Sequence, residues 1–284
     1  MINDQLLKSV NNLPAFPATV HRVSQVISDP DFSVDDLVNI IKYDQSITAN
    51  VLRMCNSPYF GTRYKISSLR EAVIYLGRTN ILQIVYTAGT SRFYKKIKGY
   101  YWGAAKLWEH SVGVALMSQI LAKKIYSFED PGFFTAGLLH DIGKVVLGEF
   151  VYESFQEIMH LVSRRGYSFL EAEQEIIGTN HAELGGEIAS LWSFPKETRD
   201  AITYHHRPDL MEKGEDSIPW IIYLADQACM MMGIGGGVDS LAYRGLKEVV
   251  DKFNFRQRDF EKSIVLLLKD LDKAKELLDL VKNE

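Results

Sequence analysis

Five of the seven histidines and two of the aspartates in this chain stand where their side chains could meet around a metal ion. His140 and Asp141 are adjacent, at the end of an apolar run that begins at Phe133, and Gly143 interrupts the pattern just after them. An imidazole beside a carboxylate offers the nitrogen and oxygen ligands that divalent metals bind. Taken alone, a His-Asp pair at a helix end is more often a helix cap beside a surface imidazole. The metal hypothesis therefore depends on the rest of the chain.

The other candidate ligands all lie in segments whose apolar periodicity predicts helices: His110, His181, His205, His206 and Asp226. Asp226 is the only carboxylate of the apolar segment 219–233, where it is costly to bury unless a positive or hydrogen-bonding group meets it. Taken singly, each of these residues also fits a structural role, such as a core histidine with one hydrogen bond.

Together the set supplies five imidazoles and two carboxylates, enough for one or two divalent ions. No thiolate motif is nearby, which favours iron, manganese or magnesium over a structural zinc site. Two cations bridged by a carboxylate can orient a water molecule and neutralise phosphoryl charge, which is the chemistry of phosphoester hydrolysis.

The elements that must position these residues are helices. Helical periodicity dominates the chain, and eight prolines and twenty glycines are few for 284 residues. Residues 13–61 predict three short helices, with Ser33 as an N-cap followed by Asp35 and Asp36. A capping box at Ser67/Ser68 and Glu71 predicts the next helix, which Gly77 interrupts. We therefore expect an all-α fold.

Further helices are predicted in the second part of the chain, at 102–125, 133–139, 145–166, 168–177, from His181, from Pro195 to the His205-His206 pair, and at 219–233. The run GIGGG at 233–237 follows no predicted strand and lacks the lysine of a P-loop, so it is interpreted as a flexible turn between helices. One or two amphipathic helices are expected between 243 and 284.

The composition and charge of the chain argue against several classes of function. The hydrophobic share of 46%, the charged share of 24% and the net charge of −4 are those of an ordinary globular protein. A helix-turn-helix interpretation of the first helices is disfavoured because the would-be recognition helix carries a single basic residue, Arg53, so direct DNA binding is not expected. Neither an export signal nor a membrane span is visible, and a cytoplasmic location is expected.

The order His … His-Asp … His … His-His … Asp on helices resembles the HD superfamily of metal-dependent phosphohydrolases, and the string HDIGK is similar to its HD-GYP branch. The strings LPAFPATV, DQSITANVLRMCNSPYFG and SLREAVIYLGRTNI resemble the narrower HDOD (HD-related output domain) family of bacterial signalling proteins. The resemblance runs from about Leu13 to the end of the segment that carries Asp226. It implies an HD-domain-like helical bundle at 101–232, an N-terminal helical HDOD subdomain at 1–100 and a C-terminal helical extension at 233–284.

Carried over to this chain, the superfamily pattern implies that His110, His140, Asp141 and Asp226 hold one metal ion. Asp141 would bridge to a second ion, and the ligands of that ion would be His181, His205 and His206. Asp141 and Lys144 are the implied catalytic residues: the carboxylate would orient an attacking water, and the lysine would contact a substrate phosphate. Arg207 is a looser candidate for phosphate binding.

Two departures from the pattern matter. The chain continues as RPDLMEKGEDS after His206, so the Gly-Tyr-Pro loop of HD-GYP enzymes is missing and cyclic di-GMP is not indicated as a substrate. Lys106 stands where some HD-GYP proteins carry an extra glutamate ligand, which disfavours a third ion.

Two functions remain open from the sequence. The first is a regulatory output module that retains a metal site and acts on a signalling protein partner. The second is a metal-dependent phosphohydrolase with a nucleotide or cyclic nucleotide as ligand and substrate. The regulatory hypothesis is favoured because the substrate loop is altered.

Overall fold

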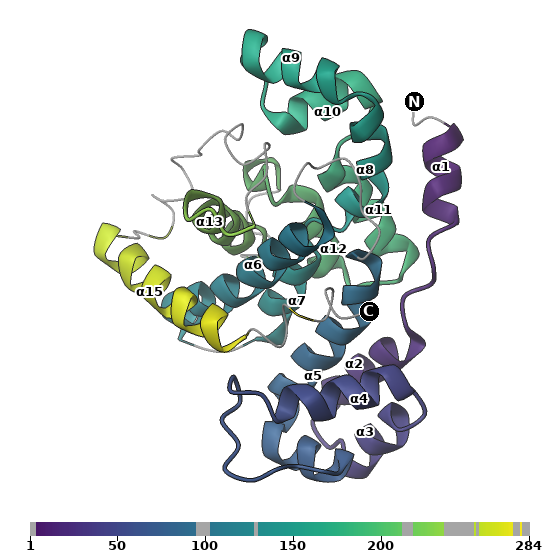
Figure 1. Cartoon of the computed structure of the whole chain (residues 1–284), viewed down its shortest axis with the longest axis vertical. Helices are drawn as coiled ribbons and strands as arrows, with labels where there is room; N and C mark the ends of the chain where they lie inside the picture. Colours follow the sequence, from purple (N-terminus) through teal and green to yellow (C-terminus); the bar gives the residue numbers. More distant parts are fainter. Residues whose placement is uncertain are drawn as a thin grey trace. The chain divides into compact units, whose positions relative to one another are not determined.

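The computed structural model describes residues 4–94, 103–127, 130–211, 218–235, 253, 256–274 and 279. All regular elements of these residues are helices, and the predicted all-α fold is confirmed (Figure 1). The chain divides into two compact units, one made of residues 14–92 and 268–284 and the other of residues 1–13 and 93–267. The three-part division expected from the sequence stays a prediction.

The first of these units contains three whole helices, α2 (Ala18–Ser28), α3 (Val34–Ile41) and α4 (Gln45–Cys55). It also contains most of α5 (Leu69–Tyr94) and the last residues of α15 (Gln257–Lys273). Ser33 caps α3 as expected, in a reciprocal capping box with Asp36. Gly77 interrupts α5 with a φ of 69° and a ψ of 178°, a conformation that only glycine adopts without strain. The predicted break in this segment is therefore confirmed.

The larger unit begins with α1 (Asp4–Asn11) and resumes at the end of α5. Its helices are α6 (Gly103–Tyr126), α7 (Pro131–Leu139), α8 (Gly143–Glu153), α9 (Phe155–Arg165), α10 (Phe169–Ile177), α11 (His181–Leu191), α12 (Lys196–Tyr204), the short 3₁₀ helix η1 (Pro208–Leu210), α13 (Ile218–Met231) and the first part of α15. The segment 145–166, expected to be helical throughout, breaks at Ser154, where α8 gives way to α9.

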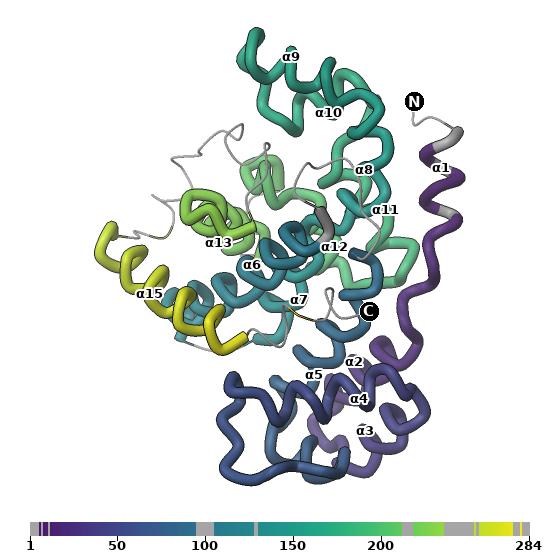
Figure 2. The backbone as a smooth tube through the Cα atoms, viewed as in Figure 1, coloured from purple at the N-terminus to yellow at the C-terminus, as the bar shows by residue number. Residues whose placement is uncertain are grey.

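The packing of this unit places the helices that carry the candidate ligands around one another. Helix α6 packs against α7 and α13, and α12 packs against α11, α7 and α13 (Figure 1). Helix α11 also packs against α8, and the backbone trace in Figure 2 turns back on itself between α9 and α10. Buried side chains such as Trp108, Phe134 and Phe169 fill the interior of this unit. The candidate ligands are thus carried by mutually packed helices.

Among the helices that the structure describes, none combines the length and the apolar character needed to cross a membrane.

Candidate metal centre

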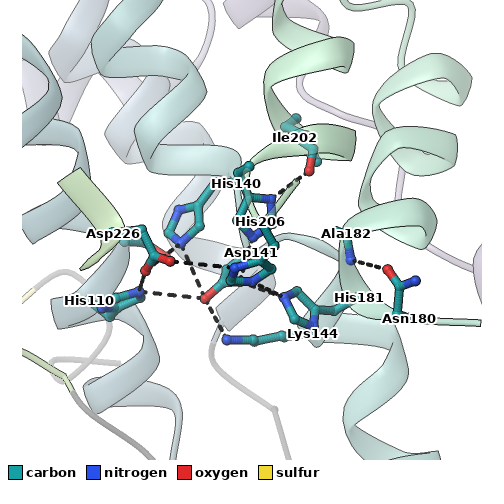
Figure 3. A network of polar contacts seen from close by, with 12 residues as sticks. His110, His140, Asp141, Lys144, Asn180, His181, Ala182, Ile202, His206 and Asp226 are labelled. Carbon is teal, nitrogen blue, oxygen red and sulfur yellow. Dashed lines mark hydrogen bonds and ion pairs between the residues drawn. The ribbon is translucent and has the colours of Figure 1, made fainter. Parts of the chain in front are cut away.

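The seven predicted ligands lie together in the larger unit, at the ends or in the middle of five segments. Figure 3 labels all of them except His205. His110 is in the middle of α6, and Asp226 is in the middle of α13. His140 ends α7, and Asp141 follows in the short turn before α8. The others are His181, the first residue of α11, and the His205-His206 pair that follows α12. Each of the seven is buried, and the most exposed, His206, shows 8% of its surface.

Asp141 stands between two groups of donors. Its Oδ2 lies 3.4 Å from Nε2 of His140 and 3.8 Å from Nε2 of His110. Its Oδ1 lies 3.5 Å from Nε2 of His181 and 3.8 Å from Nε2 of His205. The ligand atoms of His110, His140 and Asp141 gather within 4.8 Å of one another, and so do those of Asp141, His181, His205 and His206. A carboxylate shared by two such groups has the arrangement of a bridging ligand.

Asp226 lies beside both groups. Its Oδ1 is 2.9 Å from Nε2 of His110 and 3.9 Å from Nε2 of His140, and its Oδ2 is 3.7 Å from Nδ1 of His206. The positive or hydrogen-bonding partner that the sequence required for this buried carboxylate is therefore an imidazole.

Three of the histidines have their ring orientation fixed by a backbone carbonyl. Nδ1 of His140 lies 2.7 Å from the oxygen of Gly137, and Nδ1 of His205 lies 2.6 Å from that of Ile202. Nδ1 of His110 lies 3.1 Å from the oxygen of Ile234. A carbonyl oxygen can only accept, so each Nδ1 donates its hydrogen and each Nε2 faces the cluster. Imidazoles held in this way are prepared for metal binding through Nε2.

Several polar atoms at the centre of the cluster have no hydrogen-bond partner. Among the described residues, seven buried side-chain nitrogen or oxygen atoms make no hydrogen bond, and four of them belong to His140, Asp141, His205 and Asp226. Buried polar groups are seldom left unsatisfied, and such a concentration is expected where an ion or water belongs. The donor set and these atoms fit one or two divalent cations.

The electrostatics of the cluster also favour a cation. Burial lowers the pKa of His205 to about 3, with the charge of His140 as the next cause, and burial followed by the charge of His205 lowers the pKa of His206 well below its ordinary value. Burial alone would raise the pKa of the Asp141 carboxyl, but the charges of Lys144 and His140 outweigh it and hold that pKa well below its usual range. His205 and His206 are therefore neutral beside an ionised Asp141, and these are the forms that bind metals. His110 differs: burial alone would lower its pKa, but the hydrogen bond and the charge of Asp226 outweigh burial and raise it.

Lys144 and Arg207, the two basic candidates for phosphate binding, differ in burial and in their distance from the cluster. The ammonium of Lys144 is buried in the cluster, with Nζ 2.8 Å from Oδ2 of Asp141. Arg207 is at the surface, where its guanidinium forms an ion pair with Asp209 over 2.8 Å. Only Lys144 is thus placed to act together with the candidate ligands.

Two positioning features were missed from the sequence. Glu173 in α10 is fully buried, and its Oε2 lies 2.7 Å from Nδ1 of His181. The turn after α13 supplies the Ile234 carbonyl to His110, and Gly235 comes so close to α6 that an added Cβ would lie 2.5 Å from the amide nitrogen of His110. Glu173 had a signal in the sequence, because it falls on the apolar face of its helix with Phe169 and Ala172. The carbonyl of Ile234 had no signal in the sequence, because every residue has a backbone carbonyl.

The helical architecture and the His/Asp cluster place this chain in a family. The model of the HDOD domain matches residues 13–208, more than half of the chain, and the chain belongs to the HDOD family. Its all-helical fold is the HD-like fold of that family, and its buried cluster is compatible with a metal site.

Solved structures share this fold. An HDOD domain protein of unknown function from Geobacter sulfurreducens is 28% identical, with a TM-score of 0.75, over 98% of this chain and 95% of that chain. A protein from Shewanella amazonensis SB2B, provisionally named a phosphohydrolase, is 21% identical, with a TM-score of 0.70, over 98% of this chain and 97% of that one. A protein from Marinobacter aquaeolei VT8, provisionally named a signal transduction protein, is 17% identical, with a TM-score of 0.73, over 99% of this chain and 65% of that one. The last two similarities concern the fold alone.

An uncharacterised protein of Treponema pallidum (strain Nichols) is 23% identical over 201 residues, which are 69% of this chain. The match spans 38% of the length of that relative.

Proposed function

We propose that this chain is a signalling protein of the HDOD family that acts mainly as a regulatory output module, and that its buried cluster binds one or two divalent ions. The observation that carries the metal site is the shared position of Asp141 between two groups of imidazoles. His110, His140 and Asp226 would hold one ion with Oδ2 of Asp141. His181, His205 and His206 would hold the other with Oδ1.

The set of donors supports a choice of metal. Imidazole and carboxylate ligands without a thiolate suit iron or manganese, and magnesium is the harder alternative, whereas structural zinc sites are commonly built with cysteine. Two cysteines, Cys55 and Cys229, are buried in the described part, and neither belongs to the two donor groups.

The enclosure of the site supports a regulatory role. The predicted ligands and Lys144 expose between 0 and 8% of their surfaces. Structural metal ions have all their coordination positions filled by protein ligands, whereas catalytic ions keep one position for water or substrate. Seven buried donors can fill the positions of the ions without a substrate. Ions held here would join α6, α11, α12, α13 and the turn before α8, so occupancy would change the stability of all these elements together. A signalling partner would then recognise the metal-bound form. The Marinobacter protein of similar fold, provisionally named a signal transduction protein, agrees with this role.

The contact between Lys144 and Asp141 supports a second candidate function, phosphoester hydrolysis. Lys144 places a buried ammonium 2.8 Å from the carboxylate that two ions would share, which suits a phosphoryl oxygen of a nucleotide or cyclic nucleotide. A bound pair of ions would supply Lewis acidity and charge neutralisation for phosphoester hydrolysis. In that role Asp141 would orient the attacking water, and Lys144 would hold the phosphate.

Two measurements on the full-length protein test the proposal. Hydrogen exchange with and without manganese should show slower exchange in α6, α11 and α13 when the metal is present, because the ligands on these helices become joined. If exchange in these helices is unchanged by the metal, the regulatory proposal is wrong.

The second measurement separates the two functions. Manganese- or iron-loaded protein is incubated with a panel of linear and cyclic nucleotides, and the release of phosphate or monoester is followed. The regulatory proposal expects no turnover. Turnover that Lys144→Gln abolishes, with metal content retained, would replace it by the phosphohydrolase.

A further inference from the structure

Glu173 is a buried carboxylate in a helix whose other acidic residues face solvent. It shares the inner face of α10 with Phe169 and Ala172, whereas Glu171 and Glu175 are exposed. Glu171 has a local role, because it completes the capping box of α10 with Ser168. Burying a carboxylate costs free energy unless the group is paired and hydrogen-bonded. The contacts of Glu173 therefore indicate its structural role.

Glu173 accepts two hydrogen bonds from His181. Oε2 accepts the backbone N–H of His181 over 3.0 Å, at the first residue of α11, where a helix leaves its N–H groups unpaired. The same Oε2 lies 2.7 Å from Nδ1 of the His181 ring. An ionised carboxylate oxygen can only accept hydrogen bonds, so the ring nitrogen is the donor and Nδ1 carries the hydrogen. Nε2 then keeps its lone pair and lies 2.9 Å from Nε2 of His206 and 3.5 Å from Oδ1 of Asp141.

This arrangement sets His181 apart from three other histidines of the cluster. Nδ1 of His110, His140 and His205 meets a neutral backbone carbonyl. Nδ1 of His181 meets a carboxylate instead. A carboxylate partner fixes the ring and also raises the basicity of the opposite nitrogen, so His181 is the stronger donor to a cation.

The other side of Asp141 is less favourable to a cation. Oδ2, which faces His110 and His140, also holds the ammonium of Lys144 at 2.8 Å. That positive charge opposes an ion next to it, whereas Oδ1 faces two imidazoles, with Nε2 of His181 at 3.5 Å and Nε2 of His205 at 3.8 Å.

We infer that Glu173 is a positioning residue that makes the group of Asp141, His181, His205 and His206 the tighter of two metal sites. This inference rests on the proposed metal binding. An ion would therefore enter this group first, and the group of His110 and His140 would fill second.

The test is a titration of metal-free full-length protein with cobalt(II), followed by its visible spectrum. Wild-type protein should bind cobalt in two steps of unequal affinity. Glu173→Gln keeps the size and an acceptor oxygen but removes the charge, and it should weaken the first step by about 10- to 100-fold. Glu175→Gln removes the same charge from the exposed face of the same helix and should leave both steps unchanged.

The outcomes are distinguishable. If wild-type protein binds no cobalt, the proposed metal site itself is wrong. If wild-type protein binds cobalt and Glu173→Gln binds it with equal affinity and an equal spectrum, only the role of Glu173 is overturned.

A second measurement needs no variant, in case Glu173→Gln does not fold. Nitrogen-15 spectra of zinc-loaded wild-type protein should show His181 protonated at Nδ1 and metal-bound at Nε2. A hydrogen on Nε2 of His181 would overturn the inference.

Discussion

Gly143 and His181 bring two helix backbones into direct contact. A Cβ added at Gly143 would lie 1.9 Å from the carbonyl oxygen of His181, and 2.8 Å from the amide nitrogen of Gly185 one turn further along α11. Helix α8 begins at Gly143, just after the His140-Asp141 turn, and α11 begins at His181. The glycine of the HDIGK string therefore sets the distance between the Asp141 carboxylate and the histidine that faces it.

Gly143→Ala should push α8 and α11 apart. The added methyl group meets backbone, which cannot rotate away, so the free energy of unfolding should fall by about 1 to 3 kcal/mol. Metal affinity should fall as well, since Asp141 and His181 move relative to each other. Calorimetry and metal titration measure the two effects.

Gly132→Ala is the matched control, on the helix that leads to His140. Its added Cβ would meet a side-chain oxygen of Asp130 at 3.1 Å, with no backbone atom among its nearest neighbours. Equal behaviour of the two variants would contradict the role assigned to Gly143.

Gly235→Ala should disturb His110. The added Cβ would lie 2.3 Å from the oxygen of Lys106 and 2.5 Å from the nitrogen of His110, so the Ile234 carbonyl should withdraw from the His110 ring. We expect weaker metal binding. Gly233→Ala is a close control, because Gly233 also has a positive φ, of 67°, but no atom within 4 Å of an added Cβ. It should cost backbone strain of about 1 to 3 kcal/mol and leave metal binding unchanged. Similar metal affinities for the two variants would refute this role of the turn.

Asp36→Asn should show a pH-dependent loss of stability. Hydrogen bonds from the hydroxyl and the backbone N–H of Ser33 lower the pKa of the Asp36 carboxyl. Because the folded pKa lies below the unfolded one, the carboxylate stabilises the fold above the unfolded pKa, and this contribution is lost as the pH falls through the folded pKa. The midpoint of thermal unfolding should therefore be lower for the variant at neutral pH, and the two midpoints should approach each other in acid.

Asp31→Asn, on an exposed residue just before α3, controls for the general loss of a negative charge. A difference between wild type and Asp36→Asn that stays constant with pH would be inconsistent with the capping box.

The sequence predicted the helices and the candidate ligands because both leave local patterns. The N-cap at Ser33 and the interruption at Gly77 follow from side-chain chemistry and backbone freedom, which act within a few residues. Asp226 was identified as a carboxylate on an apolar helix, and the structure places it beside His110. The roles of the clustered residues as metal ligands stay predictions until an ion is measured.

The contacts that hold the ligands could not be predicted in the same way. The carbonyl of Ile234 meets a ring 124 positions away in the chain, and no side-chain pattern marks such a contact. Glu173 repeated the signal that identified Asp226, but it stands among other acidic residues in a helix with no candidate ligand of its own. The break between α8 and α9 at Ser154 was not predicted either, because apolar residues continue on both sides of it.

Metal content tests the central claim most directly. The full-length protein, purified without chelators, is analysed by mass spectrometry for bound metals and by thermal unfolding before and after chelation. We predict one to two divalent ions per chain, with iron or manganese ahead of zinc. Removing them should lower the unfolding midpoint, because an ion at about 100 times its dissociation constant contributes about 2.7 kcal/mol. Protein that contains no divalent metal, and whose unfolding midpoint does not rise when manganese, iron or cobalt is added, would contradict the account.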